Sequence, residues 1–385
     1  MKDAKTPLPN PIAHKFINDR CSFDFFHTEM NLLIDFYREH YLQNPIESAC
    51  IAVSGGGDSM ALLVMAFEWA VKSNLKISCV TVDHRLRADS AEEAKFVEDF
   101  CRSMKIDHVT LHWNRNEDIK PGKLENRARE ARYQLISEYC DRNNIPILLV
   151  GHTWNDQLET FEMRKNAGSS SIGLAGMSRI RSLSDRVKLF RPLLRFTKSH
   201  LEEFLKNRNV AWKIDPMNDQ DFFKRVFHRK EIARYNDDEI LRISNEIMEL
   251  GKKRNAVETA AVCFLKRFCK FSENGCAVVE KNRLLSEEKA VQAEIFRRIT
   301  WNVGGKKYAT TITEAICDQI LCKKINTIGR CLLKVKKDEI FAFRENRKNR
   351  LSELPCVQLD HRIAPEANEA SNVFLDKINL FDIFL

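Results

Sequence analysis

Short apolar runs alternate with longer amphipathic segments along the first half of the chain. The short runs are partly β-branched and predict strands at 48–53, 77–82, 107–113 and 147–150. The segments between them carry apolar residues at helical spacing and predict helices at 60–71, 91–104 and 124–139. Strands that alternate with helices are typical of an α/β fold, in which helices cover both faces of a parallel sheet.

The pattern changes on either side of this core. Residues 1–20 hold three prolines and little periodicity, whereas Phe23–Tyr41 predicts a covering helix. Later segments predict a long basic amphipathic helix at 239–271, helices at 287–301 and 311–322, and a hairpin of strands 330–335 and 340–343 around residues 336–339. We therefore expect a tail and helix over 1–45, an α/β domain over 46–236, and a helical and α+β C-terminal region over 237–385 that forms one or two small domains.

A glycine-rich loop follows the first predicted strand. Ligands in parallel sheets bind beyond the carboxyl ends of the strands, and Ser54–Ser59, with three glycines and Asp58, lies at such an end before a helix. Glycines let another molecule approach the main chain, and a helix N-terminus attracts anions. The loop therefore predicts a phosphate site, with an ordinary strand-to-helix turn as the alternative. It is not a Walker motif, because no lysine follows the glycines.

Polar residues also follow the second and fourth predicted strands. The residues concerned are Asp83, His84, Arg85, Leu86 and Arg87 after Val82, and Gly151 and His152 after Val150. Further on, Asn155 is the predicted N-cap of the next helix. Asp156 and Glu159 are three residues apart and share one face of that helix. Acidic residues at a solvated helix start are the alternative reading of this pair, but the position at a strand end favours a site.

The positive charge lies in the second half of the chain. The net charge is +8, and residues 186–270 contain 20 Lys/Arg and 12 Asp/Glu, while residues 323–350 contain 10 and 3. This distribution predicts contact with a polyanion in the second half. For the basic residues of the predicted hairpin, two readings stay open: contact with phosphates, or a solvated edge strand that lysine protects from aggregation.

The cysteines argue against two kinds of site. Twelve cysteines are scattered without a Cys-x-x-Cys pair, which argues against a zinc knuckle and a paired redox centre. The sequence shows no signal-peptide core and no run of membrane-spanning length. We expect no membrane partner, a cytoplasmic location and free buried thiols. A homodimer is compatible with the sequence, which does not determine the oligomeric state.

Seven motifs, in order over residues 48–230, resemble the tRNA(Ile)-lysidine synthetase family of the N-type ATP pyrophosphatase, or PP-loop, superfamily. They are 54–59; 82–87; Leu124-Glu125 with 128–133; His152 with Asp156, Gln157, Glu159 and Thr160; 173–177; 191–194; and Trp212 with Asp215, Pro216 and Asn218. The resemblance implies a Rossmann-like PP-loop fold and a ligase reaction in two steps. ATP adenylates the C2 oxygen of the wobble cytidine of tRNA(Ile) with the anticodon CAU. Free L-lysine then displaces AMP and leaves lysidine, which changes codon reading from AUG to AUA and tRNA identity from Met to Ile.

The resemblance also implies roles for individual residues. The expected ATP-binding residues are Ser54, Gly55, Gly56, Gly57, Asp58, Ser59, Val82, Asp83, His84 and Gly151. Asp58 is the expected Mg²⁺ ligand, because Mg²⁺ favours carboxylate and phosphate oxygens. The expected catalytic residues are Asp58, His152, Asp156 and Glu159, and the last three are candidates for the base that deprotonates lysine or for the group that recognises it. The expected contacts with tRNA or phosphate are Arg87, Arg132, Arg164, Arg191, Arg225 and Arg229, with a solvated helix arginine as the alternative for Arg132.

Two positions depart from the family pattern, and two other functions are alternatives. Ala167 precedes Gly168 where the family usually has arginine, and Phe227 replaces the middle arginine of a usual Arg-Val-Arg-x-Arg motif. Both positions bear on tRNA affinity rather than on the nucleotide chemistry. A PP-loop tRNA thiolase would require paired cysteines, which the sequence lacks. A non-catalytic RNA-binding relative is the other alternative, and the intact loop at Ser54–Ser59 argues against it.

Overall fold

The computed structural model describes residues 23–41, 46–85, 90–114, 124–184, 186–213, 228–229, 231–271, 276–304, 312–323 and 325–345. The chain divides into two compact units, Met1–Ile247 and Met248–Leu385. None of the described helices is long and apolar enough to span a membrane.

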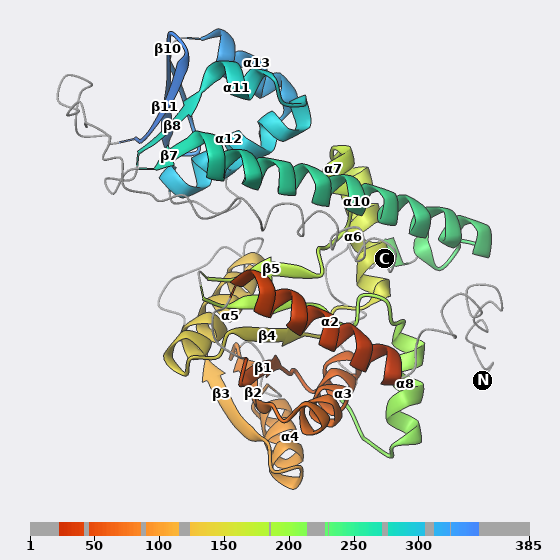
Figure 1. The fold of residues 1–385 in the computed structure, drawn as a ribbon. Helices are drawn as coiled ribbons and strands as arrows, with labels where there is room; N and C mark the ends of the chain where they lie inside the picture. The colour runs from red at the N-terminus through yellow and green to blue at the C-terminus, as the bar shows by residue number, and fades with distance from the viewer. Residues whose placement is uncertain are drawn as a thin grey trace. The chain divides into compact units, whose positions relative to one another are not determined.

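A six-stranded sheet forms the centre of the first unit (Figure 1). The strand order is β3-β2-β1-β4-β6-β5, with β1 at Ser48–Ala52, β2 at Lys76–Asp83, β3 at Asp107–His112, β4 at Ile147–Val150, β5 at Ile180–Ser182 and β6 at Lys188–Phe190. Five strands run parallel, and β5 pairs with β6 in the antiparallel sense. The four predicted strands and the parallel sheet are confirmed. The short strands β5 and β6 and the antiparallel edge were not predicted, because three residues are too few to show a period.

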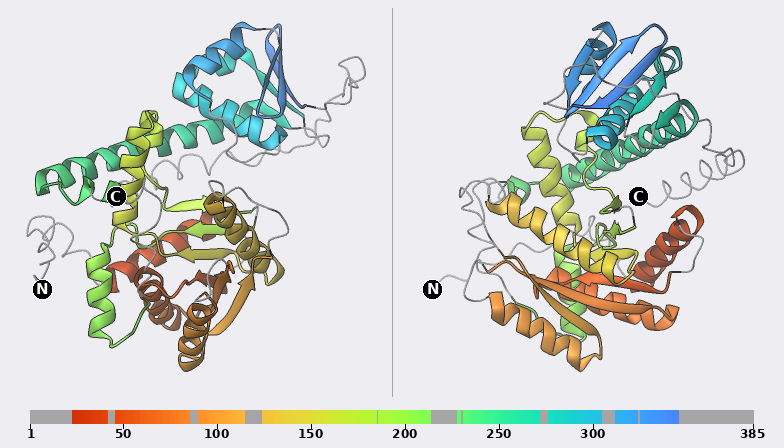
Figure 2. Two further views of the ribbon diagram at one scale, coloured as in Figure 1. Left: turned by 180° about the vertical axis from the view of Figure 1, so that it is seen from behind. Right: turned by 90° about the vertical axis from the view of Figure 1, so that its left-hand side faces the viewer.

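Helices cover both faces of this sheet, as predicted (Figure 2). The helices of the unit are α2 (Phe23–Tyr41), α3 (Gly57–Ser73), α4 (Ser90–Ser103), α5 (Leu124–Arg142), α6 (Trp154–Asn166), α7 (Ser171–Leu174) and α8 (Lys198–Asn207). Ile136 and Cys140 of α5 pack against one face, where they meet Cys50, Leu148 and Leu189 of the sheet. The helices α2, α3 and α4 lie on the opposite face. The sequence predicts α2 with the bounds that the structure has.

The first unit also includes the start of α10 (Asp237–Phe268). Ile243 and Ile247 of α10 are buried against Leu158 and Phe161 of α6. The unit therefore continues beyond residue 236, where the sequence placed the boundary. A chain that ended there would expose the apolar side of α6. The three-part division of the chain stays a prediction.

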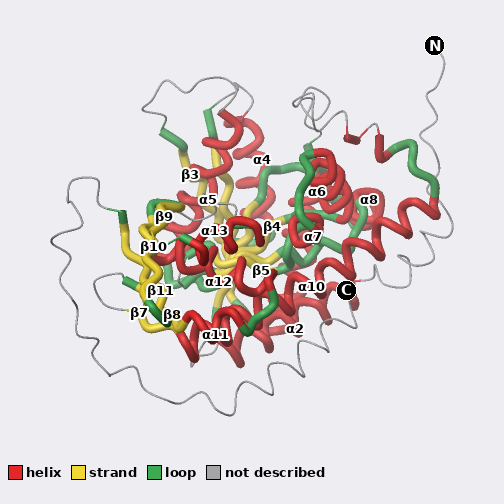
Figure 3. The backbone as a smooth tube through the Cα atoms, turned by 90° about the horizontal axis from the view of Figure 1, so that it is seen from above, coloured by secondary structure: helices red, strands yellow, loops and turns green. Residues whose placement is uncertain are grey.

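The second unit contains a five-stranded antiparallel sheet with helices on one of its faces (Figure 3). The order is β7-β8-β11-β10-β9, with β7 at Cys269–Phe271, β8 at Ala277–Glu280, β9 at Ile325–Ile328, β10 at Cys331–Lys336 and β11 at Glu339–Arg344. The helices are α11 (Lys281–Leu285), α12 (Lys289–Gly304) and α13 (Glu314–Cys322). Ile295, Phe296 and Ile299 of α12 are buried in one core with Leu333 and Ile340 of the sheet.

The structure corrects two expectations for this unit. The predicted hairpin is confirmed as β10 and β11, with a turn at Lys337 and Asp338, but neither strand is an edge strand, because β9 and β8 flank them. The reading of a solvated edge strand is therefore wrong. The long helix ends at Phe268 instead of Phe271. Cys269–Phe271 pair with β8 and form the edge strand β7, so that sheet pairing takes precedence over the helical pattern.

A buried ion-pair network joins α2 to the residues just before β5 and just after β6. The Glu29 carboxylate is 2% exposed and pairs with Arg179, and its Oε1 lies 3.7 Å from Nη1 of Arg195. Burial, aided by the charge of Arg195, lowers the pKa of Arg179 to about 10. Glu29 therefore compensates two guanidinium groups with little access to water.

Replacing this carboxylate should destabilise the first unit strongly. Glu29→Ala leaves a buried guanidinium without its counter-charge, and we expect the free energy of unfolding to fall by about 3–5 kcal/mol. The matched control is Glu98→Ala, which breaks an exposed pair with Arg102 on α4 and should cost less than about 1 kcal/mol. Urea denaturation of the two variants measures the difference. Equal losses would show that burial adds nothing to the Glu29 pair.

Candidate active site

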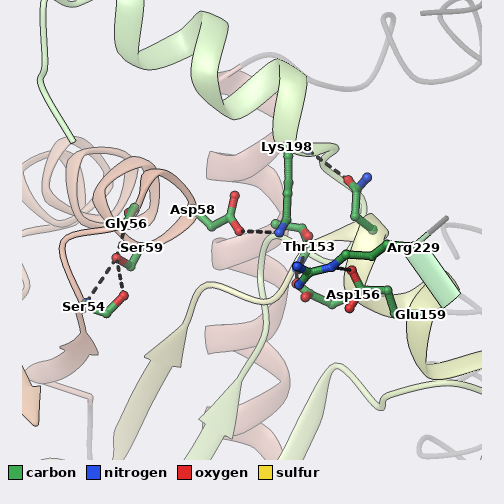
Figure 4. Close-up of polar contacts among 10 residues, drawn as sticks. Ser54, Gly56, Asp58, Ser59, Thr153, Asp156, Glu159, Lys198 and Arg229 are labelled. Atoms are coloured by element: carbon green, nitrogen blue, oxygen red, sulfur yellow. Dashed lines mark hydrogen bonds and ion pairs between the residues drawn. The ribbon is translucent and has the colours of Figure 1, made fainter. Parts of the chain in front are cut away.

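The glycine-rich loop holds a tight turn at the end of β1. Gly55 has φ of +86°, which favours glycine at this position. The Ser59 hydroxyl donates to the carbonyl of Gly56 at 2.9 Å and accepts from the N–H of Ser54 at 3.2 Å (Figure 4). The helix α3 begins at Gly57, so its first-turn N–H groups, which have no acceptor inside the helix, face the loop. This is the geometry of an anion site.

Two distant segments pack closely against this loop. A Cβ added to Gly151, just after β4, would lie 3.1 Å from the carbonyl oxygen of Asp58. A Cβ added to Gly57 would lie 3.3 Å from Cδ1 of Trp212. The N–H of Lys213 donates to the carbonyl of Gly55 at 2.9 Å. The end of β4 and residues 212–213 therefore enclose the loop, as the strand-end rule predicts for β4.

Asp58 lies beside a lysine that the sequence did not single out. Nζ of Lys198 is 3.7 Å from Oδ2 of Asp58, as Figure 4 shows. Burial raises the pKa of Asp58 to about 6, although Lys198 opposes the shift, and the negative charge of Asp156 adds to it. Lys198 is the first residue of α8, and its N–H donates to Oδ1 of Asn155 at 3.0 Å. Nothing in the local sequence marked Lys198, because its role depends on the packing of α8.

Asp156 has a structural role at the start of α6. Its Oδ2 accepts from the N–H of Thr153 at 2.7 Å and from the Thr153 hydroxyl at 2.8 Å. Thr153 is the N-cap of this helix, so the prediction that Asn155 is the N-cap is wrong. In a capping box, an acidic side chain three residues after the N-cap accepts a hydrogen bond from the N–H of the N-cap residue. This pattern explains why α6 begins after Thr153 and not after Asn155. Asp156 remains close enough to Asp58 to affect its pKa.

Glu159 is buried and forms an ion pair. Nε of Arg229 donates to Oε1 of Glu159 at 2.6 Å, and the Glu159 residue is 7% exposed. The structure thus brings Arg229, predicted as a contact for tRNA or phosphate, to the predicted catalytic acid. The two residues lie 70 positions apart in the sequence.

His152 and His84 lie in a cationic part of the first unit. Burial, with Arg191 and Arg129 nearby, lowers the pKa of His152 well below the usual value. Burial and the charge of Arg132 lower the pKa of His84 to about 4. Both rings are therefore neutral at pH 7. Among the described residues Nδ1 of His152 is buried without a hydrogen-bond partner.

Three arginines pack around one tyrosine beside these histidines. The guanidinium carbons of Arg129, Arg132 and Arg181 lie 5.3, 5.4 and 5.0 Å from the ring centroid of Tyr133. Cation–π contacts of this kind hold guanidinium groups in place. Arg129 and Arg181 join Arg132 as candidates for phosphate contact that the sequence did not identify. The signal for Arg129 was present in the Ala128–Tyr133 motif.

Arg164 and Arg191 hold a loop of the protein itself. Nη1 of Arg164 donates to the carbonyls of Gly173 and Gly176 at 2.6 and 2.9 Å. Nη1 of Arg191, a residue 4% exposed, donates to the carbonyl of Ser178 at 2.6 Å. These bonds shape the chain between α7 and β5. A contact of either arginine with tRNA stays a prediction.

Asp83 likewise shapes its own loop. Its Oδ1 accepts from the N–H of Arg85 and the hydroxyl of Ser90, both at 2.8 Å. Burial alone would raise the pKa of Asp83, but these hydrogen bonds and the charge of His112 lower it. The carboxylate thus organises the turn after β2. Its role and that of Val82 in ATP binding stay predictions.

The sequence also singled out positions 87, 167, 225 and 227. Arg87, Arg225 and Phe227 lie outside the described residues, and Ala167 is exposed at the C-terminal end of α6. No cluster of three His, Cys, Asp or Glu side chains able to hold a metal occurs in the described part of the chain. Asp58 fits a Mg²⁺ site in which phosphate oxygens supply further ligands, as Mg²⁺ sites on nucleotides commonly do.

Comparison with known proteins agrees with this geometry. Residues 31–235 match the family of PP-loop domains, which defines the class of protein. The chain is 31% identical over 313 residues to the tRNA(Ile)-lysidine synthase of Wolbachia pipientis wMel, over 77% of this chain and 70% of the relative. It is 28% identical to that of Ruegeria pomeroyi, over 78% and 72%, and 37% identical to that of Orientia tsutsugamushi, over 51% and 44%. The chain belongs to the tRNA(Ile)-lysidine synthase family.

The raised pKa of Asp58 should make stability depend on pH. Its pKa is about 6 in the folded protein and 3.8 in a model compound, so folding disfavours the carboxylate above pH 6. Asp58→Asn should therefore raise the free energy of unfolding at pH 8 by about 1–3 kcal/mol. The gain should shrink between pH 6 and pH 4, because the wild-type side chain is then protonated in the folded state. Urea denaturation at several pH values measures it.

Lys198→Met is the matched variant for this measurement. It removes the ammonium that lowers the pKa of Asp58, so the midpoint for Asp58 should move to a higher pH in an NMR titration. A gain from Asp58→Asn that is the same at pH 4 and pH 8 would contradict the assigned cause.

Proposed function

We propose that this protein ligates free L-lysine to C2 of the wobble cytidine of tRNA(Ile) with the anticodon CAU. ATP is consumed to AMP and pyrophosphate, and the product is lysidine. The observation that carries this proposal is the position of the anion site. The loop Ser54–Ser59 opens directly beside an acidic cluster of Asp58, Asp156 and Glu159, and an ammonium group, that of Lys198, already lies against Asp58.

The first step requires the phosphates of ATP to be held. The N-terminus of α3 and the hydroxyl of Ser59 suit the phosphate groups. Mg²⁺ bound by Asp58 would neutralise part of the phosphate charge. Arg129, Arg132 and Arg181 offer positive charge for a second phosphate group or for RNA. The C2 oxygen of the cytidine bonds to the α-phosphorus, and pyrophosphate leaves.

The second step requires a neutral lysine amine. The pKa of a free lysine ammonium is about 10.4, so a proton must be removed before the nitrogen attacks C2. The nitrogen then forms the C2–N bond, and AMP leaves with the oxygen. Asp156 and Glu159 supply the negative charge that attracts the ammonium. The low pKa of His152 makes this ring a weak base, and it suits a hydrogen bond to substrate better than proton removal.

The alternatives have less support. Sulfur transfer would use cysteines at the strand ends, yet Cys50, Cys79, Cys101 and Cys140 are buried in the sheet and its helices. A non-catalytic relative would not need the intact loop at Ser54–Ser59. We place the reaction in the cytoplasm, and the expected use of ATP and tRNA supports this.

Transfer of labelled lysine tests the function directly. Incubation of the protein with ATP, Mg²⁺, labelled lysine and tRNA(Ile) should place the label in a lysidine nucleoside, seen by mass analysis. Asp58→Ala should lower this rate by about 100-fold or more, because the phosphate charge loses its compensation. Glu68→Ala, on the same helix but paired with Arg208, is the control and should stay near the wild-type rate. Release of AMP without lysine transfer, or transfer of sulfur or ammonia, would reject the function.

Removing a carboxylate of the acidic cluster should weaken the binding of lysine more than the binding of ATP. Asp156→Ala should raise KM for lysine about 10-fold or more and leave KM for ATP nearly unchanged, because a carboxylate close to the ammonium is lost. Thr153→Ala is the matched control, since it removes a hydrogen bond of the same cap and keeps the carboxylate. It should change KM for lysine less than about threefold. Similar changes in both variants would mean that Asp156 acts only as a helix cap.

A further inference from the structure

The five-stranded sheet of the second unit has two chemically different faces. Buried residues on one face pack against α11, α12 and α13, and include Ala277, Val279, Cys331, Leu333, Ile340 and Ala342. The strand register places another set on the opposite face, namely the six residues Lys270, Val278, Leu332, Lys334, Phe341 and Phe343; Glu280, Glu339 and Lys336 follow in the next row, at one end of this face. None of this second set belongs to the helix-side core. We call these six residues the open face.

Two aromatic rings lie side by side on the open face. Phe341 and Phe343 are two residues apart on β11, so their side chains point to the same side. Their ring planes differ by 2°, and their centroids are 6.1 Å apart. Both side chains are partly exposed in a strand whose alternate residues, Ile340 and Ala342, are buried. Two parallel, accessible rings present separate surfaces on which flat groups can stack.

Lysines flank the rings across the sheet. The register aligns Lys270, Val278, Phe341 and Lys334 in one row over four strands, β7, β8, β11 and β10. Both lysines are exposed, and within the described residues neither forms an ion pair. In the sequence, residues 323–350 carry 10 Lys/Arg and 3 Asp/Glu. The open face thus combines aromatic rings with two exposed lysines, while the acids Glu280 and Glu339 lie in the row at one end of the same face.

We propose that the open face binds an unpaired segment of RNA, with two successive bases stacked on Phe341 and Phe343 and phosphates beside Lys270 and Lys334. Sheets with exposed aromatic residues and basic neighbours bind single strands in this way. The proposal rests on the proposed function, because tRNA is then the natural partner. A base-paired helix fits poorly, since its bases already stack on each other. A second copy of the chain fits poorly too, because a symmetric contact would bring like charges together.

Binding of a single-stranded oligoribonucleotide to the full chain tests the role of the rings. The probes are an eight-nucleotide RNA, its duplex and tRNA(Ile), each at several salt concentrations. Phe341→Leu with Phe343→Leu keeps the apolar character of the strand and removes the aromatic surfaces. The double variant should bind the single strand about 10-fold or more weakly, with an unchanged slope of log affinity against log salt. The duplex should bind more weakly than the single strand to the wild-type protein.

Replacing the two lysines of the open face should change the salt dependence of RNA binding. Lys270→Gln with Lys334→Gln should reduce the salt slope by about 1 for each lysine, because fewer counterions are released. Lys266→Gln, an exposed lysine of α10 outside the open face, is the matched control and should leave the slope of the single strand unchanged. Circular dichroism of each variant checks that the sheet is intact.

Three results would overturn the proposal. They are unchanged binding of the single strand by the double phenylalanine variant, equal binding of duplex and single strand, and, in analytical ultracentrifugation, a wild-type dimer that the double phenylalanine variant loses while it keeps its RNA affinity. Lysine transfer by the wild-type protein at saturating tRNA distinguishes failure of the open-face proposal from failure of the proposed function. If lysine is transferred but the phenylalanine variant binds RNA normally, the open face is wrong and the function stands. If the variant loses RNA affinity but the wild type transfers no lysine, the function is wrong and the open face stands.

Discussion

The close approach of β4 to the start of α3 determines where the site forms. Gly151 lies so near the first turn of α3 that a single added carbon would come within 3.1 Å of the carbonyl oxygen of Asp58. This contact exists because parallel strands end at one edge of the sheet. It places the helix that carries Asp156 and Glu159 next to the helix N-terminus that attracts anions. The proposed ATP site and the acidic cluster therefore follow from one packing constraint.

Electrostatics divide the site into two parts with different affinities. Burial, and after it the negative charge of Asp156, raises the cost of a negative charge at Asp58, and the pKa of Asp58 rises to about 6. Beside them the arginines around Tyr133 and His152 disfavour further positive charge, and both histidines are held neutral. A cationic amine and an anionic phosphate are thus attracted to neighbouring but distinct places, as a reaction between lysine and an adenylated base requires.

In the second unit, strand register instead of a helix N-terminus determines the position of the proposed binding surface. Its antiparallel sheet buries one face under helices and leaves the other to present alternate side chains. Because alternation has a period of two, the residues that build the core also determine which residues reach the opposite face. The rings of Phe341 and Phe343 are therefore placed by the same register that buries Ile340 and Ala342. Fold stability and RNA contact would be coupled through that register.

The sequence by itself determined the local features of this protein. The hydrophobic pattern predicted α2 and β4 with their observed bounds, and the three glycines indicated the loop between β1 and α3, because these signals depend only on neighbouring residues. The tertiary structure alone decided which distant side chains meet. Lys198 reaches Asp58, Arg229 pairs with Glu159, and Arg164 serves a loop of the protein, since such contacts depend on how helices pack. The same reason explains β7, where pairing with β8 overrode a helical pattern.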